Sequence, residues 1–291
     1  MHRVASSTSS FKAAYYWLCL ALTGVACFAA QTALLHWTGG RTTKSESNYF
    51  SSLARLQSGS RGEPRVMLLG SSITGRLPDR SRGFEGVANL GCDGGSAVEV
   101  LRAMDAGTIP RPPAMIVEGN TLYRAVGAKE TELAQAMSKR SFRTGVDIPN
   151  LGAGGRPSAV AYTLLMERKM GSVDPLATMP LPVASRPASL AQAQGAEFTK
   201  AEDELLEELK AILQRLAAAG SKVSIVVLPP GADPASTQRT LPEELARRSG
   251  VPYWDLASAI GKDAVRYTDG VHMDPPSAAA ALRTILDATG Y

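Results

Sequence analysis

Cysteine and histidine are both scarce in this chain of 291 residues, which contains three of each. Three cysteines exclude the disulfide framework of a small secreted domain, and they also exclude a zinc site with four cysteine ligands. The histidines are His2, His36 and His272, which are too few for a site built mainly from histidine. We therefore expect neither a metal nor a cofactor, and chemistry that needs a histidine has few candidates.

Acidic residues are scarce at the N-terminal end. Residues 1–62 contain a single one, Glu46, and carry a net charge of +5. The whole chain has a formal net charge of +4, so the remaining residues carry −1. A strongly basic domain, which is typical of nucleic-acid binding proteins, is absent. We therefore expect no nucleic-acid partner.

Charged side chains are also missing from residues 13–37. This run is longer than the roughly 20 mostly apolar residues that a helix needs to cross a bilayer. Tyr15, Tyr16 and Trp17 at one end and Trp37 at the other suit the two membrane interfaces, where aromatic rings settle. The pattern predicts a transmembrane anchor over residues 13–37, preceded by a short tail of residues 1–12.

Two other interpretations of this segment stay open. It could be a buried core helix, although a core helix has no need of aromatic residues at both ends. It could also be a cleaved signal peptide, with Ala29 and Ala30 beside the cleavage site, although the apolar stretch continues through Leu34 and Leu35. The basic residues on its two sides do not decide the orientation of the segment in a membrane.

The residues after this segment divide into a tether and a folded domain. Residues 38–62 are rich in glycine, serine, threonine and arginine and are typical of a linker, with a short helix over 49–56. Residues 63–291 form the predicted domain, in which short apolar runs alternate with amphipathic ones. We predict strands at 65–69, 87–90, 114–117, 222–228 and 253–256, and helices at 96–103, 129–140, 158–170, 198–219 and from Pro275 or Pro276 onward.

This alternation predicts an α/β fold, a three-layer sandwich in which helices cover both faces of a mainly parallel sheet. One region departs from it, because residues 144–196 are rich in glycine and proline. This insertion could line or cover a site, or it could be a solvated loop.

Four polar segments lie at predicted strand ends or just before the last helix: residues 70–73, 89–96, 118–120 and 269–272. Ligand sites in parallel sheets lie at the carboxyl ends of the strands, so these segments are candidates for one site. A serine hydroxyl is a poor nucleophile until a base takes its proton. His272 is the only histidine outside the membrane segment and its edge, which makes it the candidate base for Ser72.

The other parts of such a site can also be assigned. Asp269 precedes His272 by three residues and can accept a hydrogen bond from one ring nitrogen while the other faces the serine. The oxyanion that develops during attack needs donors. The backbone N–H groups of Ser72 and Gly94 and the side-chain amide of Asn120 are the candidates.

Each of these residues also has an ordinary structural interpretation. Ser72 could cap a helix that follows the first strand, and its neighbour Ser71 is a competing nucleophile. Asn120 could be a turn residue, and the Asp269 segment is a common turn sequence. A single histidine such as His272 is more often structural than catalytic.

Together the four segments resemble the SGNH hydrolase superfamily, the GDSL-type esterases, over about residues 62–291. The resemblance implies a flavodoxin-like sheet and places the nucleophile third in a Gly-Asp-Ser triplet, which is Ser72 here. It also implies the catalytic roles of His272 and Asp269. The chain departs from the family pattern at Ser71, which replaces the aspartate of the triplet, at Glu118 in the third segment and at Thr121, which follows that segment.

The Gly-Ser-Ser opening and the N-terminal anchor resemble the branch of this superfamily that O-acylates cell-surface polymers, such as the proteins of alginate O-acetylation and of teichoic acid D-alanylation. That resemblance implies an O-acetyltransferase that modifies an extracytoplasmic polysaccharide, with a membrane-bound O-acyltransferase as acyl supplier. It also implies a single-pass protein of the inner cell membrane with its domain in the periplasm. An esterase or polysaccharide deacetylase with the same triad is the alternative, and a vestigial polymer-binding protein is a third possibility.

Overall fold

A single parallel sheet organises the described part of the chain, which in this computed structural model comprises residues 8–128, 130–170, 179–181, 197–231, 237–260 and 264–291. The strand order is β2–β1–β3–β4–β5. The strands are β1 (Val66–Gly70), β2 (Val87–Gly91), β3 (Ala114–Glu118), β4 (Lys222–Val227) and β5 (Tyr253–Asp255). The predicted α/β fold with a parallel sheet is therefore confirmed.

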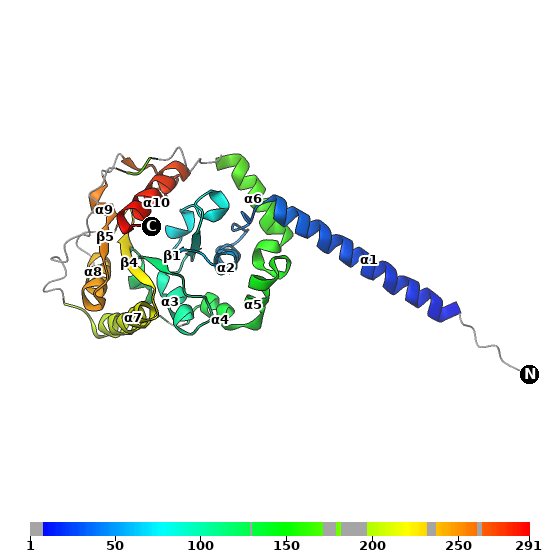
Figure 1. Cartoon of the computed structure of the whole chain (residues 1–291), viewed down its shortest axis with the longest axis horizontal. Coiled ribbons are helices and arrows are strands. Elements are labelled where there is room, and N and C mark those ends of the chain that lie inside the picture. The colour runs from blue at the N-terminus through cyan, green and yellow to red at the C-terminus, as the bar shows by residue number, and fades with distance from the viewer. Residues whose placement is uncertain (1–7, 129, 171–178, 182–196, 232–236, 261–263) are drawn as a thin grey trace, which may run out of the picture.

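Apolar side chains pack on both faces of this sheet, and Figure 1 shows the helices around it. Successive strand residues point to opposite faces, so Met67 and Leu69 enter one apolar cluster while Val66 and Leu68 enter another. The first cluster contains residues of α3 (Ala97–Asp105), α7 (Lys200–Ala218) and α8 (Thr237–Ser249). The second contains residues of α9 (Leu256–Ala259) and α10 (Pro275–Thr289).

One of two helices predicted from the sequence matches the structure, and the other is divided in two. The predicted helix over 198–219 is α7, whose leucine-rich face is buried and whose start is capped by Thr199 and Glu202. The predicted single helix over 129–140 is instead two helices, α4 (Glu132–Ser138) and α5 (Arg140–Asp147). The break at Lys139 allows Met137 and Phe142 both to be buried, although residues five apart lie on different faces of one helix.

The first part of the predicted insertion contains short helical segments and a longer helix. They are η4 (Pro149–Leu151), η5 (Ala153–Gly155) and α6 (Pro157–Met170). Most of the rest of the predicted insertion, residues 171–178 and 182–196, lies outside the described residues. The expectation that the insertion lines or covers a site therefore stays a prediction.

The predicted tether is packed against the domain. Its helix, α2 (Asn48–Gly59), lies beside β2, and Leu56 is completely buried there. Polar side chains of α2 are buried as well, because they find backbone partners: Gln57 donates to the Phe142 carbonyl and accepts from the Ala153 N–H. The folded domain therefore begins before residue 63.

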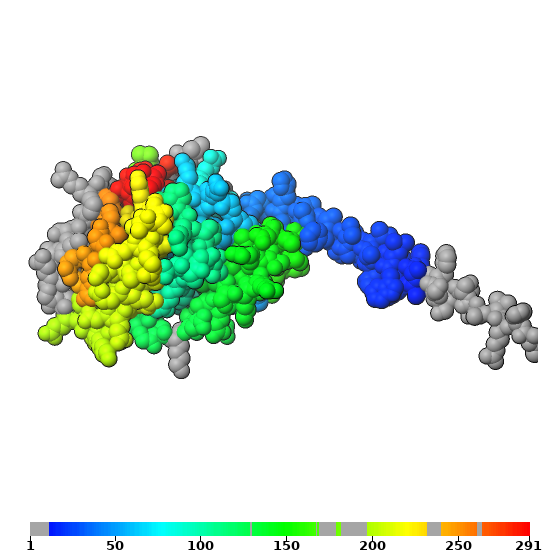
Figure 2. Space-filling model, turned by 60° about the horizontal axis from the view of Figure 1, so that its bottom comes forward, coloured from blue at the N-terminus to red at the C-terminus, as the bar shows by residue number. Residues whose placement is uncertain are grey.

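The N-terminal helix α1 (Thr8–Trp37) projects away from this domain (Figures 1 and 2). Its segment Lys12–Trp37 is long and apolar enough to cross a membrane, and none of its most apolar stretch is buried. This exposure excludes the interpretation as a core helix. The membrane anchor and the signal peptide both remain compatible with the structure.

Candidate functional site

The structure brings Ser72, His272 and Asp269 into one hydrogen-bonded series. Ser72 follows β1, and the other two residues lie in the loop before α10. The Oγ atom of Ser72 lies 2.8 Å from Nε2 of His272, and Nδ1 of His272 lies 2.7 Å from Oδ2 of Asp269. An ionised carboxylate only accepts, so the Nδ1–H donates to Asp269 and Nε2 is free to accept the hydroxyl proton of Ser72. This is the arrangement that activates a serine nucleophile.

Asp269 also shapes the loop that carries the histidine. Its Oδ1 atom accepts the backbone N–H groups of Val271, at 3.1 Å, and of His272, at 2.8 Å. These bonds, with the ring of His272, hold the pKa of Asp269 well below its ordinary value. The carboxylate therefore stays ionised at neutral pH and fixes both the turn and the orientation of the imidazole.

The competition between the two adjacent serines is resolved by their surroundings. The hydroxyl of Ser71 is buried, donates to Glu118 at 2.7 Å and accepts the Ile73 N–H at 3.1 Å. Ser72 is only partly buried and faces His272. The helical turn that follows, η1 (Thr74–Arg76), has no side-chain cap, so Ser72 is not a capping residue here. Ser72 is thus the serine in position to act as nucleophile.

Glu118 is a buried carboxylate directly behind the Ser72 turn. It is 1% exposed and accepts hydrogen bonds from three residues. Its Oε2 atom receives the backbone N–H groups of Ser71 (2.9 Å) and Thr74 (3.0 Å) and the Thr74 hydroxyl (2.6 Å). Its Oε1 atom receives the hydroxyls of Ser71 (2.7 Å) and Thr121 (3.1 Å). The carboxylate therefore holds both ends of the segment that carries the nucleophile.

Gly70 is required by the same contacts. A Cβ atom at this position would lie 2.1 Å from Oγ1 of Thr74 and 2.4 Å from Oε2 of Glu118, far inside van der Waals distance. The glycine in front of the two serines thus makes room for the buried carboxylate. The sequence identified Glu118 only as a departure from a family pattern, and no local signal in the sequence revealed its position behind Ser72.

We expect Glu118→Ala to lower the free energy of unfolding, because each buried donor left without an acceptor costs about 1–3 kcal/mol. Glu118→Gln should cost less, since one amide oxygen can replace Oε2 and the hydroxyls near Oε1 can turn to accept. If Glu118 positions Ser72, kcat should fall in the same order, with Ala below Gln below wild type. Denaturant unfolding and acyl turnover would be measured together, with the exposed Glu204→Ala as control. Equal turnover in all variants would contradict the positioning role.

The three predicted oxyanion donors lie in different environments. Within the described residues, the backbone N–H groups of Ser72 and Gly94 donate to no other protein group. Gly94 has a φ of +82°, a conformation that favours glycine, and nothing lies within 4 Å of the place where a Cβ would stand. The Asn120 amide donates to the Leu228 carbonyl at 2.7 Å, and its oxygen accepts from the Leu228 N–H at 2.8 Å.

Asn120 thus joins the ends of β3 and β4 and keeps one N–H for another partner. Its structural interpretation and its predicted role as an oxyanion donor are therefore compatible. The contribution of Ser72, Gly94 and Asn120 to an oxyanion site stays a prediction.

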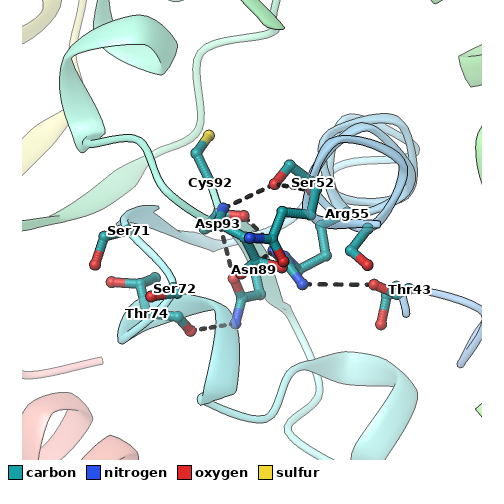
Figure 3. A network of polar contacts seen from close by, with 12 residues as sticks. Thr43, Ser52, Arg55, Ser71, Ser72, Thr74, Asn89, Cys92 and Asp93 are labelled. Carbon is teal, nitrogen blue, oxygen red and sulfur yellow. Dashed lines mark hydrogen bonds and ion pairs between the residues drawn. The ribbon is translucent and has the colours of Figure 1, made fainter. Parts of the chain in front are cut away.

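The loop after β2 is held by buried polar contacts (Figure 3). The side chain of Asn89 donates to the carbonyls of Thr74 and Leu77, both at 2.7 Å, and accepts the Gly91 N–H at 2.9 Å. It thereby ties the loop that contains Gly94 to the segment that follows Ser72. Asn89 is a residue of β2, and its side chain connects two parts of the site.

Arg55 of α2 supports this loop from the other side. It is 2% exposed, donates to the Gly91 carbonyl at 2.8 Å and forms an ion pair of 2.6 Å with Asp93. Burial raises the pKa of Asp93, but Arg55 and Lys44 more than offset this and lower it below the ordinary value. The backbone N–H of Asp93 also donates a hydrogen bond to the hydroxyl of Ser52, a second residue of α2, at 2.7 Å. The sequence did not reveal this function of α2.

The described residues contain no group of three or more side chains that could hold a metal ion. Cys92 is the single cysteine outside α1, and it is fully buried, which raises the pKa of its thiol far above the ordinary value. A buried, protonated thiol is a poor nucleophile. The serine is therefore the stronger candidate for covalent chemistry.

No family model, curated protein or solved structure matches this chain. The functional conclusion is carried by the site itself, which combines a paired nucleophile and base with an orienting carboxylate and free backbone donors nearby.

Proposed function

We propose that this protein is a serine O-acyltransferase of the SGNH type, with a flavodoxin-like three-layer sandwich as its domain. The hydrogen-bonded series Ser72–His272–Asp269 is the observation that supports this most, because it couples residues 200 positions apart in the sequence into a nucleophile, a base and an orienting group. Residues so far apart gain this geometry only through the fold.

The reaction would proceed through an acyl-serine ester. Ser72 Oγ attacks the carbonyl carbon of the donor ester while its proton moves to Nε2 of His272. The tetrahedral intermediate places its negative oxygen near the N–H groups of Ser72 and Gly94, and its collapse gives the proton to the leaving alcohol. A sugar hydroxyl then loses its proton to His272 and attacks the acyl carbon, which regenerates the Ser72 hydroxyl.

The proposed setting is the outer face of a cell membrane. In this proposal α1 anchors the chain in a bacterial-type inner membrane, and the domain lies in the periplasm, where an extracytoplasmic polysaccharide is the acceptor. A membrane-bound O-acyltransferase would supply the acyl group, which in this proposal is acetyl.

The contacts of Glu118 argue against a vestigial site. Glu118 and Ser71 are two of the three departures from the family pattern, yet their side chains hydrogen bond to each other at 2.7 Å. They form one matched pair that supports the Ser72 segment. A decayed site would not be expected to keep such complementarity.

Transfer and hydrolysis share the acyl-serine and differ in the second nucleophile. The test incubates the full chain in detergent with an activated acetyl ester, with and without oligosaccharides of several compositions. Transfer predicts acetylated sugar by mass spectrometry and less free acetate as sugar is added, with Ser72→Ala inactive. Free acetate that does not respond to any sugar would support the esterase alternative. Failure of a serine-directed phosphonate to label the folded wild-type chain would contradict both enzymes.

Asp269→Asn should leave weak acyl turnover. The base remains, but an amide can donate to Nδ1, so the ring is no longer held in the tautomer that accepts from Ser72; comparable changes cost about 10⁴-fold in kcat. Asp255→Asn, at the end of β5 and outside the Ser72–His272 pair, serves as the matched control. Wild-type turnover in the Asp269 variant would contradict its orienting role.

A further inference from the structure

We infer that the domain has a second contact with the bilayer, formed by exposed apolar side chains of η4, of the residue before it and of α6. We call this surface the apolar patch. The inference depends on the proposal that α1 spans the membrane. The most exposed members of the apolar patch are Leu151, at 61%, and Leu165, at 64%. Its other members are Ile148, Tyr162 and Leu164.

Helix α6 has apolar residues on two faces. Ala159, Val160 and Thr163 are buried against the domain, whereas Tyr162, Leu164 and Leu165 are exposed. Its apolar stretch Pro157–Met166 is too short to cross a bilayer, which takes roughly 20 residues. Among the described residues nothing covers this exposed face, and exposed apolar side chains can bury themselves in the membrane interface.

Hydrogen bonds hold η4 against the part of α1 that is proposed to span the membrane. The amide of Asn150 donates to the Thr32 hydroxyl at 2.8 Å and to the Phe28 carbonyl at 3.3 Å. In return, Gln31 of α1 donates to the carbonyls of Asn150 (2.9 Å) and Gly155 (2.7 Å). Polar groups that enter a membrane must find partners within the protein, and these two amides satisfy each other and the neighbouring backbone.

The position of these bonds along α1 sets the depth of η4. Gln31 precedes Trp37 by six residues, which is about 9 Å along a helix axis. With Trp37 at the interface, η4 reaches the boundary between headgroups and acyl chains. Interfacial helices bury their apolar face to a similar depth, about 5–10 Å.

The hydrogen bonds of Asn150 with Thr32 and Gln31 join η4 directly to the proposed membrane span of α1. A cavity of about 380 Å³ beside the last turn of α1 is lined by His36 and Arg61 together with Asn150. Because η4 is continuous with the span, lipid is favoured over a second protein as the occupant of the apolar patch.

The test uses the full chain in lipid nanodiscs and a nitroxide spin label on single cysteines. Cys92 is completely buried and stays unlabelled. Leu151→Cys and Leu165→Cys are each made in a Cys19→Ser/Cys27→Ser background. Native Cys19, exposed on α1, is retained alone as the membrane control, and exposed Ala217→Cys on α7 is the aqueous control. Collision with oxygen, which concentrates in lipid, is compared with collision with a water-soluble nickel chelate.

We expect the oxygen-to-nickel accessibility ratio at positions 151 and 165 to be several-fold above that at 217 and close to that of Cys19. An aqueous ratio at 151 and 165 with a lipid ratio at Cys19 would overturn the apolar patch and leave the span of α1 intact. Low accessibility to both reagents would show a protein partner and would also overturn it. An aqueous ratio at Cys19 would refute the span itself, and the apolar patch with it.

Discussion

Replacement of Ser72 or His272 by alanine is expected to reduce acyl turnover by roughly 10⁴- to 10⁶-fold, the range found when a serine or histidine is removed from a catalytic triad. Without the Ser72 hydroxyl no acyl-enzyme forms, and without His272 Nε2 the proton of that hydroxyl, 2.8 Å away, has no acceptor. Turnover of an activated ester by the full chain would be measured for each variant. The double variant should lose little more than either single one, because the two residues act as a unit.

Matched substitutions separate this loss from misfolding. Ser138→Ala, on the exposed surface of α4, and His36→Ala, at the end of α1, remove the same side chains outside the site. Both should keep wild-type turnover, and far-UV circular dichroism should be the same for all variants. Turnover of the His272→Ala variant equal to that of wild type would refute the proposed mechanism.

Arg55→Ala should strongly destabilise the fold, with a loss of about 3–5 kcal/mol in the free energy of unfolding. It removes a buried guanidinium and leaves the Asp93 carboxylate and the Gly91 carbonyl, which lie 2.6 Å and 2.8 Å from it, without their partner. Arg55→Lys should recover only part of the loss, because one ammonium cannot reproduce the planar fork of the guanidinium. Denaturant unfolding of the full chain in detergent measures both.

Arg102→Ala is the control for Arg55, since it breaks an ion pair with Glu208 whose two side chains are 39% and 40% exposed. Exposed pairs contribute about 0–1 kcal/mol. The stabilisation by Arg55 should also depend on pH. Because the pKa of Asp93 lies below its ordinary 3.8 in the folded protein, this contribution is present above that value and lost as the pH falls through the folded-state pKa. A loss in Arg55→Ala no greater than in Arg102→Ala would contradict the role of the buried pair.

The effect of Arg55 should extend to the site. Arg55 and Asn89 hold the loop that presents Gly94, so a loosened loop places this predicted oxyanion donor less accurately. The segment that the sequence classified as a tether is therefore part of the support of the site. A chain truncated at residue 63 would lack α2 and with it the buried partner of Asp93.

The order of strands and helices could be predicted from the sequence because it depends on local patterns. The β-branched run before Pro229 predicts β4, and the leucine spacing after Thr199 predicts α7. The scarcity of histidine left His272 as the only candidate base of the domain. An apolar run without charge predicted α1, which is long enough to cross a membrane.

Only the tertiary structure decided how these pieces act together. Apart from the family resemblance, the sequence could not choose between Ser71 and Ser72, because the choice depends on Glu118, which is 47 residues away and buried behind the first serine. It also could not show that Arg55 enters the domain, since a charged side chain is buried only when distant groups supply its partners. Local patterns fix the elements, whereas the partners of buried polar groups come from segments far apart in the chain and are decided only when the elements pack.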